Sequence, residues 1–333
     1  MQNSPFLTIV IPVYNGAKVV SRCLDSIWTQ GLDDLSYEVI CVNDCSTDDT
    51  ESVLKHIQYS HSNLHVLNNF VNKRAGGSRN YGVREAKGRY IVFIDSDDYF
   101  HPFALKQVIE ILHVNDLDIL MCDFARETEF QKNNNIFLKF PNHMILTGRD
   151  FLLLNGCPFG PCKYIFKRNL MVEQSIFFEE NVCCEDVDWV HKITLAADSI
   201  QYRPILLSHV VINDLSQTAN EHKMLKTVSD KFFAGYRMNQ LAEYFRDDVD
   251  VYKKLEAVSA VYYKQGVKYF TAIYADVYEK KSVLEKYFPY KLTMLPKIVK
   301  LALKLPLVYS MLTNITAPLI CFIIKEKRKI KGR

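Results

Sequence analysis

Three aspartates, Asp95, Asp97 and Asp98, stand directly after the apolar run Tyr90–Ile94. Like charges this close repel one another and raise one another's pKa unless a cation neutralises them. Asp95 and Asp97 alternate along an extended segment, so their side chains project to the same side. Carboxylate oxygens suit Mg²⁺ or Mn²⁺, ions that commonly complete their coordination with substrate phosphates. We therefore expect a divalent metal here, because a solvated acidic turn would explain Asp98 alone.

A second polar segment, Ile11–Gly16, ends the first apolar run of the chain. Pro12 interrupts a strand, and the pair Asn15-Gly16 is a turn signal. The ring of Tyr14 could stack on a nucleobase. A strand end followed by a capped helix explains the same residues, so this segment alone leaves both interpretations open.

The third segment, Val42–Thr50, follows the second apolar run. Asp44 stands where an acidic residue can accept a hydrogen bond from a ribose or a base N–H. For Ser46 and Asp48 we favour helix capping, since both are good N-cap residues. Asp44 is therefore the ligand candidate of this segment.

The fourth segment, Asn72–Asn80, combines glycines with arginines. Gly76-Gly77 would let the backbone approach a ligand, and Arg74 and Arg79 can pair with phosphates. It is neither a P-loop nor a GxGxxG turn. Alone it is a weak indication of an anion site.

These segments must be positioned by a sheet, because short apolar runs alternate with helical patterns through the N-terminal half. Such a rhythm predicts a doubly wound α/β fold, with ligands at the carboxyl ends of its strands. The expected strands are 7–13, 37–42, 64–67, 90–94 and 119–122, and the expected helices are 17–30, 47–60, 77–87 and 102–113.

The second half of the chain changes character twice. Residues 129–151 are irregular and polar, with a hairpin or loop at 132–135. A strand at 163–166, a helix at 187–197 and strands within 201–212 should complete the first domain, expected at 1–215. We expect a helical extension at 216–290 and an amphipathic, basic tail at 291–333.

The tail predicts contact with an anionic membrane surface. Leu305–Ile324 is uncharged and long enough in principle to span a bilayer, but Pro306 and Pro318 weaken that interpretation. Lysines upstream alternate with apolar residues, as in an interfacial helix, and residues 325–333 hold six basic side chains and one acidic. We expect peripheral attachment, with a helix packed on protein as the alternative.

Composition narrows the classes of partner and the compartment. The chain has 333 residues and a net charge of +3, from 41 basic and 38 acidic residues, so no nucleic-acid partner is expected. Nine scattered cysteines without framework spacing indicate a reducing, cytoplasmic location. Cys157, Cys162 and Cys183-Cys184 fit no common zinc spacing, so buried free thiols are favoured.

Together these segments resemble the family 2 glycosyltransferases, and in particular the members that build bacterial polysaccharides. The resemblance runs from Leu7 to about Leu195. Each motif is common alone, whereas four in this order are specific. It implies a fold of the GT-A type, with a doubly wound, mostly parallel sheet flanked by helices, and a C-terminal helical extension here. The motifs are Thr8-Ile-Val-Ile-Pro-Val-Tyr-Asn15, Val42-Asn-Asp-Cys-Ser-Thr-Asp48, Ser78-Arg-Asn-Tyr-Gly82 and Asp95-Ser-Asp-Asp98.

The resemblance also implies a nucleotide-diphosphate sugar donor, usually a UDP-sugar, and Mn²⁺ or Mg²⁺. Asp95-Ser96-Asp97 would be the DxD element of the family, with Asp95 towards the ribose and Asp97 on the metal. Arg74 or Arg79 would lie near the uridine and diphosphate. The nucleoside would be contacted from the first segments, by Pro12, Tyr14 and Asp44, with Asn15 beside them.

A later acidic pair, Glu185-Asp186, resembles the motif that carries the base in inverting members. By itself the pair is explained as helix-start charge. Because it follows a DxD element at the usual distance, we assign Asp186 as the general base that deprotonates an acceptor hydroxyl. Cys183 and Cys184 depart from the aromatic or glycine residues often found there, which leaves the acceptor contacts open.

We therefore expect an inverting transferase that acts on a glycan or lipid-linked glycan acceptor in cell-surface polysaccharide synthesis. A nucleotidyltransferase of related fold is disfavoured, because Tyr14–Lys18 is not the Gly-rich, Arg-containing loop of that class. A non-catalytic nucleotide- or carbohydrate-binding module is disfavoured because Asp97 and Asp186 are both present. The residues specify neither the sugar nor the oligomeric state.

Overall fold

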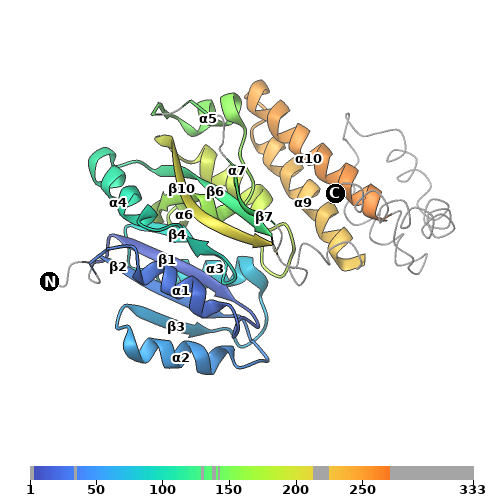
Figure 1. The fold of residues 1–333 in the computed structure, drawn as a ribbon. Helices are drawn as coiled ribbons and strands as arrows, with labels where there is room; N and C mark the ends of the chain where they lie inside the picture. The colour runs from blue at the N-terminus through green and yellow to red at the C-terminus, as the bar shows by residue number, and fades with distance from the viewer. Residues whose placement is uncertain are drawn as a thin grey trace. The chain divides into compact units, whose positions relative to one another are not determined.

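Apolar strands of the N-terminal half form one side of a ten-stranded mixed sheet (Figure 1). The computed structural model describes residues 4–33, 36–128, 131–136, 140–141, 143–212 and 225–270. Strand β1 pairs in parallel with β2 and β4, and β2 with β3. These strands are β1 Leu7–Val13, β2 Tyr37–Asn43, β3 Leu64–Asn68 and β4 Tyr90–Phe93.

The other side of the sheet is largely antiparallel. Strand β9 lies between β4 and β6 and is antiparallel to both, while β6 and β10 are parallel. The remaining strands β5, β7 and β8 also pair in antiparallel fashion. These strands are β5 Tyr99–Phe100, β6 Ile119–Thr128, β7 Gln131–Ile136, β8 Ile145–Leu146, β9 Tyr164–Lys167 and β10 Ile200–Ile212.

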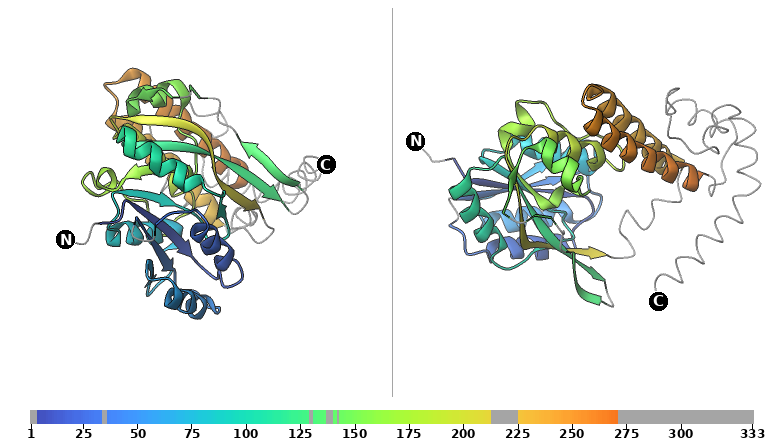
Figure 2. Two further views of the ribbon diagram at one scale, coloured as in Figure 1. Left: turned by 60° about the vertical axis from the view of Figure 1, so that its left-hand side comes forward. Right: turned by 90° about the horizontal axis from the view of Figure 1, so that it is seen from above.

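The expected α/β sheet flanked by helices is confirmed, but it is mixed rather than mostly parallel. Strands β4 and β6 run in the same direction, joined through the crossover helix α4 Ala104–Asn115, and β9 is inserted between them in the opposite direction. The polar segment 132–135, expected as a hairpin or loop, is part of β7, and the long strands β6 and β10 run side by side (Figure 2). Among the strands that the structure describes, β7 pairs only with β6 and so lies at an edge of the sheet. Its polar composition therefore did not indicate a strand.

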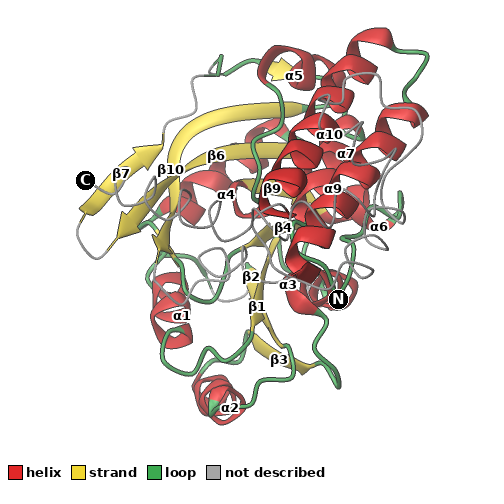
Figure 3. Ribbon diagram, turned by 90° about the vertical axis from the view of Figure 1, so that its right-hand side faces the viewer, coloured by secondary structure: helices red, strands yellow, loops and turns green. Residues whose placement is uncertain are grey.

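Helices cover both faces of the sheet (Figure 3). Residues alternate along β1, so Ile9 and Ile11 pack with α1, α2 and α4 on one face. Val10 packs on the other face with α3, α5, α6 and α7. The helices are α1 Val20–Trp28, α2 Thr50–Ser60, α3 Arg74–Glu85, α4 Ala104–Asn115, α5 Gly148–Asn155, η1 Pro161–Lys163, α6 Arg168–Val172 and α7 Asp186–Leu195.

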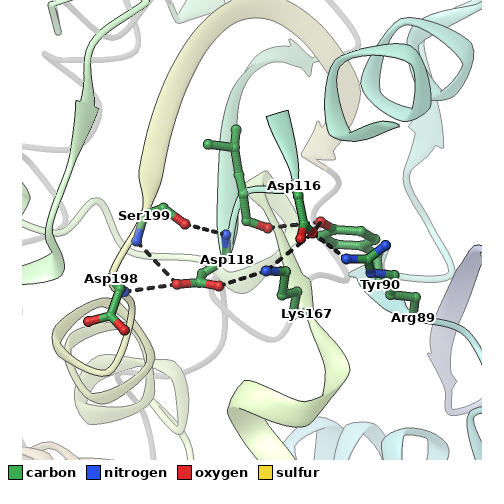
Figure 4. A network of polar contacts seen from close by, with 8 residues as sticks. Arg89, Tyr90, Asp116, Asp118, Lys167, Asp198 and Ser199 are labelled. Carbon is green, nitrogen blue, oxygen red and sulfur yellow. Dashed lines mark hydrogen bonds and ion pairs between the residues drawn. The ribbon is translucent and has the colours of Figure 1, made fainter. Parts of the chain in front are cut away.

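A polar network fastens the sheet at the end opposite to the predicted site (Figure 4). Lys167 Nζ, at the end of β9, donates to Asp118 Oδ1 at 3.0 Å and lies 3.2 Å from Asp116 Oδ1. Asp118 Oδ2 accepts from the N–H groups of Asp198 and Ser199 at 2.9 and 3.1 Å. The network therefore holds together the end of β9 and the starts of β6 and β10.

The chain divides into two units, Met1–Asn213 and Asp214–Arg333. The described part of the second unit is a pair of helices, α9 Leu225–Tyr244 and α10 Val249–Phe270, which confirms a helical extension there. The ring of Phe232 lies 5.9 Å from that of Phe270, and the Ser259 hydroxyl donates to the Gly235 carbonyl at 2.8 Å. The predicted tail 291–333 lies outside the described residues. In the part of the chain that the structure describes, no helix is both long and apolar enough to cross a membrane.

Candidate active site

The loops after β1 and β2 are tied to each other at the carboxyl edge of the parallel strands. Asn15 donates its backbone N–H to Ser46 Oγ at 2.9 Å, and its Oδ1 accepts from the N–H of Thr47 at 2.8 Å. Ser46 was expected to cap the helix that follows, but its hydroxyl instead joins the loop after β2 to the loop after β1. Asp48 lies one residue before the N-cap residue Asp49, and its Oδ1 accepts from the N–H of Thr50, the first residue of α2, at 3.1 Å.

These links turn the ring of Tyr14 outwards from the same loop. The Tyr14 side chain is 46% exposed, whereas Val13 before it is buried. Pro12 lies in β1, in register with Val42 of β2. Asn15 occupies the left-handed region with φ 50°, which asparagine tolerates better than most residues. The loop thus presents Tyr14 to a ligand and uses Asn15 to hold its own shape.

Asp44, at the end of β2, organises the loop between β3 and α3. Its side chain is only 2% exposed. Oδ1 accepts from Asn69 Nδ2 and from the N–H of Lys73, both at 2.8 Å. These bonds give Asp44 a structural role, and its contact with a nucleobase stays a prediction.

Arg79 on α3 joins two acidic segments that are distant in sequence. Its Nη2 donates to Asp95 Oδ1 at 2.6 Å, and its Nη1 donates to Glu185 Oε1 at 2.8 Å. The Arg79 side chain is 3% exposed and stacks between the rings of Phe93 and Phe178, at 5.8 and 5.6 Å. Burial alone would lower its pKa, but the charges of Asp95 and Glu185 raise it above its usual value.

The two arginine candidates thus differ in their surroundings. Arg79 has carboxylates where the sequence predicts a diphosphate, so the structure gives it contacts other than the predicted ones. Arg74 begins α3 with φ 59°, and its Nη1 contacts the sulfur of Cys183. Contact of either arginine with a donor remains a prediction.

Glycines in α3 let the helix pack against the segment that precedes Asp186. A Cβ at Gly76 would lie 2.8 Å from the Glu179 carbonyl oxygen and 3.0 Å from Glu185 Cγ. Asn80 holds the same segment, donating to the Phe178 carbonyl and accepting from its N–H, both at 2.9 Å. Gly76-Gly77 were expected to let the backbone approach a ligand, which stays a prediction; both lie in α3, where Gly76 allows the close packing on Glu179 and Glu185.

The segment after β4 carries the acidic motif. Arg22 of α1 donates to the carbonyl oxygen of Asp97. Burial, and then the charge of Asp95, raise the pKa of the Asp97 carboxyl. Asp98 is 4% exposed and accepts from the N–H of Val211 at 2.9 Å, with a pKa raised to about 8 by burial and then by Asp95. Asp98 is therefore a buried part of the fold, whereas the acidic-turn interpretation expected a solvated side chain.

The donor set fits a hard divalent ion. Asp95 and Asp97 supply carboxylates. Burial, and then the charge of Asp95, raise the pKa of the Asp97 carboxyl, and a bound cation would favour its ionised form. Within the described residues, no three His, Cys, Asp or Glu side chains gather to hold a metal ion. Mg²⁺ is commonly held by one or two carboxylates and completed by substrate phosphates, so a two-aspartate site is of the right kind. Ser96 lies between the two, close to Gly16.

Asp186 is the first residue of α7 and is partly exposed. Its Oδ2 accepts from the N–H of Gly160 at 2.8 Å. Burial raises the pKa of its carboxyl, and the Gly160 N–H and the charge of Arg79 oppose that rise. Because Glu185 is bonded to Arg79, the structure distinguishes the two acids of the pair: Glu185 is ion-paired and Asp186 is held by a peptide N–H.

Sequence reasoning missed three residues of this site. Arg22, Asn80 and Lys163 all contact its segments. Asn80 stands within the Ser78–Gly82 motif and Lys163 within the stretch before the acidic pair, so motif position was the available signal. Arg22 lies on a helix with no motif, and nothing in the sequence singled it out.

Comparisons with known proteins show which sequences and structures the chain resembles. The family model described as glycosyl transferase family 2 matches residues 8–171. The poly(ribitol-phosphate) beta-glucosyltransferase of Bacillus spizizenii is 40% identical over 116 residues, which are 34% of this chain and 18% of that protein. The match thus spans less than a fifth of that relative's length.

Solved structures share the fold of the chain. Residues 1–349 of Staphylococcus aureus TarS, crystallised with UDP-GlcNAc, superpose with a TM-score of 0.64 at 17% identity, over 97% of this chain and 92% of that one. The mannosyltransferase PcManGT of Pyrobaculum calidifontis, in complex with GDP-Man and Mn²⁺, gives 0.54 at 16% identity, over 94% and 87%. Residues 8–171 of this chain therefore resemble glycosyl transferase family 2, and the expected GT-A fold is confirmed.

Proposed function

We propose that the chain is an inverting glycosyltransferase that moves a sugar from a UDP-sugar to a hydroxyl of a glycan or lipid-linked glycan, in cell-surface polysaccharide synthesis. The observation that carries this proposal is the bridge made by Arg79. One buried guanidinium contacts both the Asp95 and the Glu185 carboxylates, so the DxD segment and the segment of Asp186 meet in one site.

The donor side of the proposal is supported by the loops after β1 and β2. The exposed ring of Tyr14 is suited to stacking on a uracil, and Asp44 lies behind it at the end of the next strand. TarS, which shares the fold, was crystallised with UDP-GlcNAc. We therefore use UDP-GlcNAc as the first donor to test.

Asp97, with Asp95 beside it, would hold Mn²⁺ or Mg²⁺. When bound, such an ion supplies positive charge to the leaving diphosphate. Two arginines position the acidic segment: Arg22 donates to the backbone carbonyl of Asp97, and Arg79 donates to the carboxylate of Asp95. The fold relative PcManGT was solved with Mn²⁺, which supports a divalent ion.

Asp186 would take the proton of the acceptor hydroxyl. Its Oδ2 accepts from Gly160, so Oδ1 is the oxygen to receive that proton. The acceptor oxygen then forms a bond to the anomeric carbon while the bond from that carbon to the diphosphate oxygen breaks, and the configuration inverts. Glu185 is unsuited to this step because Arg79 already occupies its carboxylate.

The base assignment is tested with Asp186→Asn. UDP release from UDP-GlcNAc with Mn²⁺ should fall by about 10²–10⁴-fold, the usual contribution of a positioned base. UDP affinity should stay near that of the wild type. Asp116→Asn is a matched control, because Asp116 is an ion-paired aspartate in the network of Figure 4. Near-normal UDP release by Asp186→Asn would remove Asp186 from the mechanism.

The metal assignment is tested by calorimetry of UDP binding with and without Mn²⁺. The wild type should bind UDP more tightly with Mn²⁺, and Asp97→Ala should lose that gain. If Asp97→Ala keeps the full effect of Mn²⁺, the ion is held elsewhere.

Membrane attachment through residues 291–333 belongs to the same proposal and rests on the basic residues of 325–333. The full chain should sediment with phosphatidylglycerol vesicles, and a chain that lacks Leu292–Arg333 should stay in the supernatant. Equal sedimentation of the two would refute this attachment.

A further inference from the structure

Lys163 is a buried lysine beside the proposed base, and no step above uses it. It ends η1, and its side chain is 7% exposed. Its Nζ donates to the carbonyl oxygen of Phe159 and lies 4.6 Å from the centre of the Phe124 ring. A lysine is seldom this buried without a specific partner.

That partner belongs to the peptide unit that holds Asp186. The carbonyl of Phe159 and the N–H of Gly160 form one peptide group, and this N–H donates to Asp186 Oδ2 at 2.8 Å. In a trans peptide the C=O and the N–H point in opposite directions. The ammonium of Lys163 thus lies at the oxygen end of one peptide dipole, and the carboxylate of Asp186 lies at its hydrogen end.

The local backbone is shaped for this arrangement. Gly160 has φ 92°, a conformation that other residues rarely adopt. A Cβ built on Gly160 would have the Lys163 Nζ as its nearest neighbour, at 3.7 Å. Hydrogen bonds with a charged partner are stronger than neutral ones, and bonds in series polarise one another. A charged Lys163 therefore makes the Gly160 N–H a better donor to Asp186.

We propose that Lys163 is a positioning residue for Asp186, acting through the Phe159–Gly160 peptide to orient the carboxylate and keep it ionised. This inference deepens the proposed function and rests on the role given there to Asp186. The geometry on which it stands, two bonds through one peptide, is independent of which donor or acceptor is used.

The charges around the pair support this role. Burial lowers the pKa of Lys163 to about 8, against the opposing charges of Cys162, Asp186 and Asp123, while Arg126 lowers it further. Asp186 faces Lys163 from α7, and Arg79 of α3, Glu185 and Tyr164 of β9 face Asp186 as well. A positive charge favours the ionised carboxylate, so loss of the Lys163 charge must raise the pKa of Asp186.

The test is a carbon-13 NMR titration of the full chain labelled at aspartate Cγ, with the Asp186 signal assigned by its loss in Asp186→Asn. In Lys163→Met the Asp186 midpoint should move to higher pH by about one unit, at the lower end of the effect of an adjacent charge. Lys163→Arg, which keeps the charge, should restore the wild-type midpoint. Lys167→Met is the matched control, since Lys167 pairs with Asp116 and Asp118 instead.

The wild type provides a second readout that needs no variant. Its Asp186 signal should shift again near pH 8, as Lys163 loses its proton, and Lys163→Met should lack this inflection. An unmoved midpoint in Lys163→Met, or no wild-type inflection between pH 7 and 9, would overturn the proposal. Neither NMR measurement needs a donor. Absence of UDP release from the wild-type protein would therefore refute the proposed function without deciding whether Lys163 acts on Asp186.

Discussion

Replacing Arg79 with methionine should destabilise the first unit more than most single substitutions. The change leaves Glu185, 16% exposed, without its partner, and breaking a buried ion pair costs about 3–5 kcal/mol. The second partner, Asp95, is 43% exposed, so solvent screens it and its share is at most about 1 kcal/mol. Arg84→Met is the matched control, because Arg84 is 48% exposed and 4.0 Å from Glu180, and it should cost less than about 1 kcal/mol.

Urea unfolding followed by tryptophan fluorescence measures this loss. Both tryptophans of the chain, Trp28 and Trp189, lie in the first unit, so the signal reports that unit alone. Adding Glu185→Gln to Arg79→Met should recover part of the loss, because it removes the unpaired charge. A loss in Arg79→Met below about 1 kcal/mol would refute the reasoning, since a bridge between two acids would then contribute no more than a surface pair.

The Arg79→Met penalty should also depend on pH. Burial raises the pKa of Glu185, and the charge of Arg79 opposes that rise. Without Arg79 the folded-state pKa of Glu185 is higher still, so folding then favours the protonated acid. Its contribution to stability is present at low pH and is lost as pH rises through that raised pKa. The penalty should therefore be smaller at pH 5 than at pH 8.

Three further substitutions test other parts of the structure. Gly82→Ala should lower the free energy of unfolding, measured by urea titration, by about 1–3 kcal/mol, because the new Cβ would lie 2.4 Å from Val10 Cγ1. Adding Val10→Ala should restore part of the lost stability. Thr147→Ala should cost about 1 kcal/mol in the same assay, since Thr147 Oγ1 caps α5 by accepting from the N–H of Asp150 at 3.2 Å; an unchanged midpoint would show that the cap contributes nothing. Tyr14→Ala should weaken UDP binding about 10-fold by calorimetry, as expected for loss of one stacking platform, while Tyr14→Phe should bind UDP like the wild type. Equal UDP affinities of Tyr14→Ala and the wild type would show that the uracil does not stack on Tyr14.

The parts of the site that follow from strand ends could be predicted from the sequence. Asp44 and Asp95 come after apolar runs, and parallel strands bring such ends to one edge of a sheet. The repelling charges of the acidic set after β4 led to the expectation of a metal ion, and that expectation stays a prediction. The fold class followed from the same alternation of apolar runs and helical patterns.

Contacts between α3 and the segment before Asp186 could not be predicted in this way. Gly76 and Arg79 weakly indicated an anion site, and only the structure places the backbone of Glu179 and the carboxylate of Glu185 beside them. Those neighbours are far along the chain and depend on where β9 inserts in the sheet. A pattern of residue types carries no information on that insertion, so the role of Arg79 had to come from the structure.

The position of β9 has a consequence for how the protein is made. During synthesis, β4 and β6 emerge long before Tyr164–Lys167, the strand that fills the gap between them. Until then each of the two strands presents an unpaired edge, which is a hazard for association between nascent chains. The carboxylates of Asp95 and Glu185 also cannot share one guanidinium before that closure. We therefore expect the ribosome-bound chain to need shielding until β9, and then β10 on the other side of β6, have left the exit tunnel.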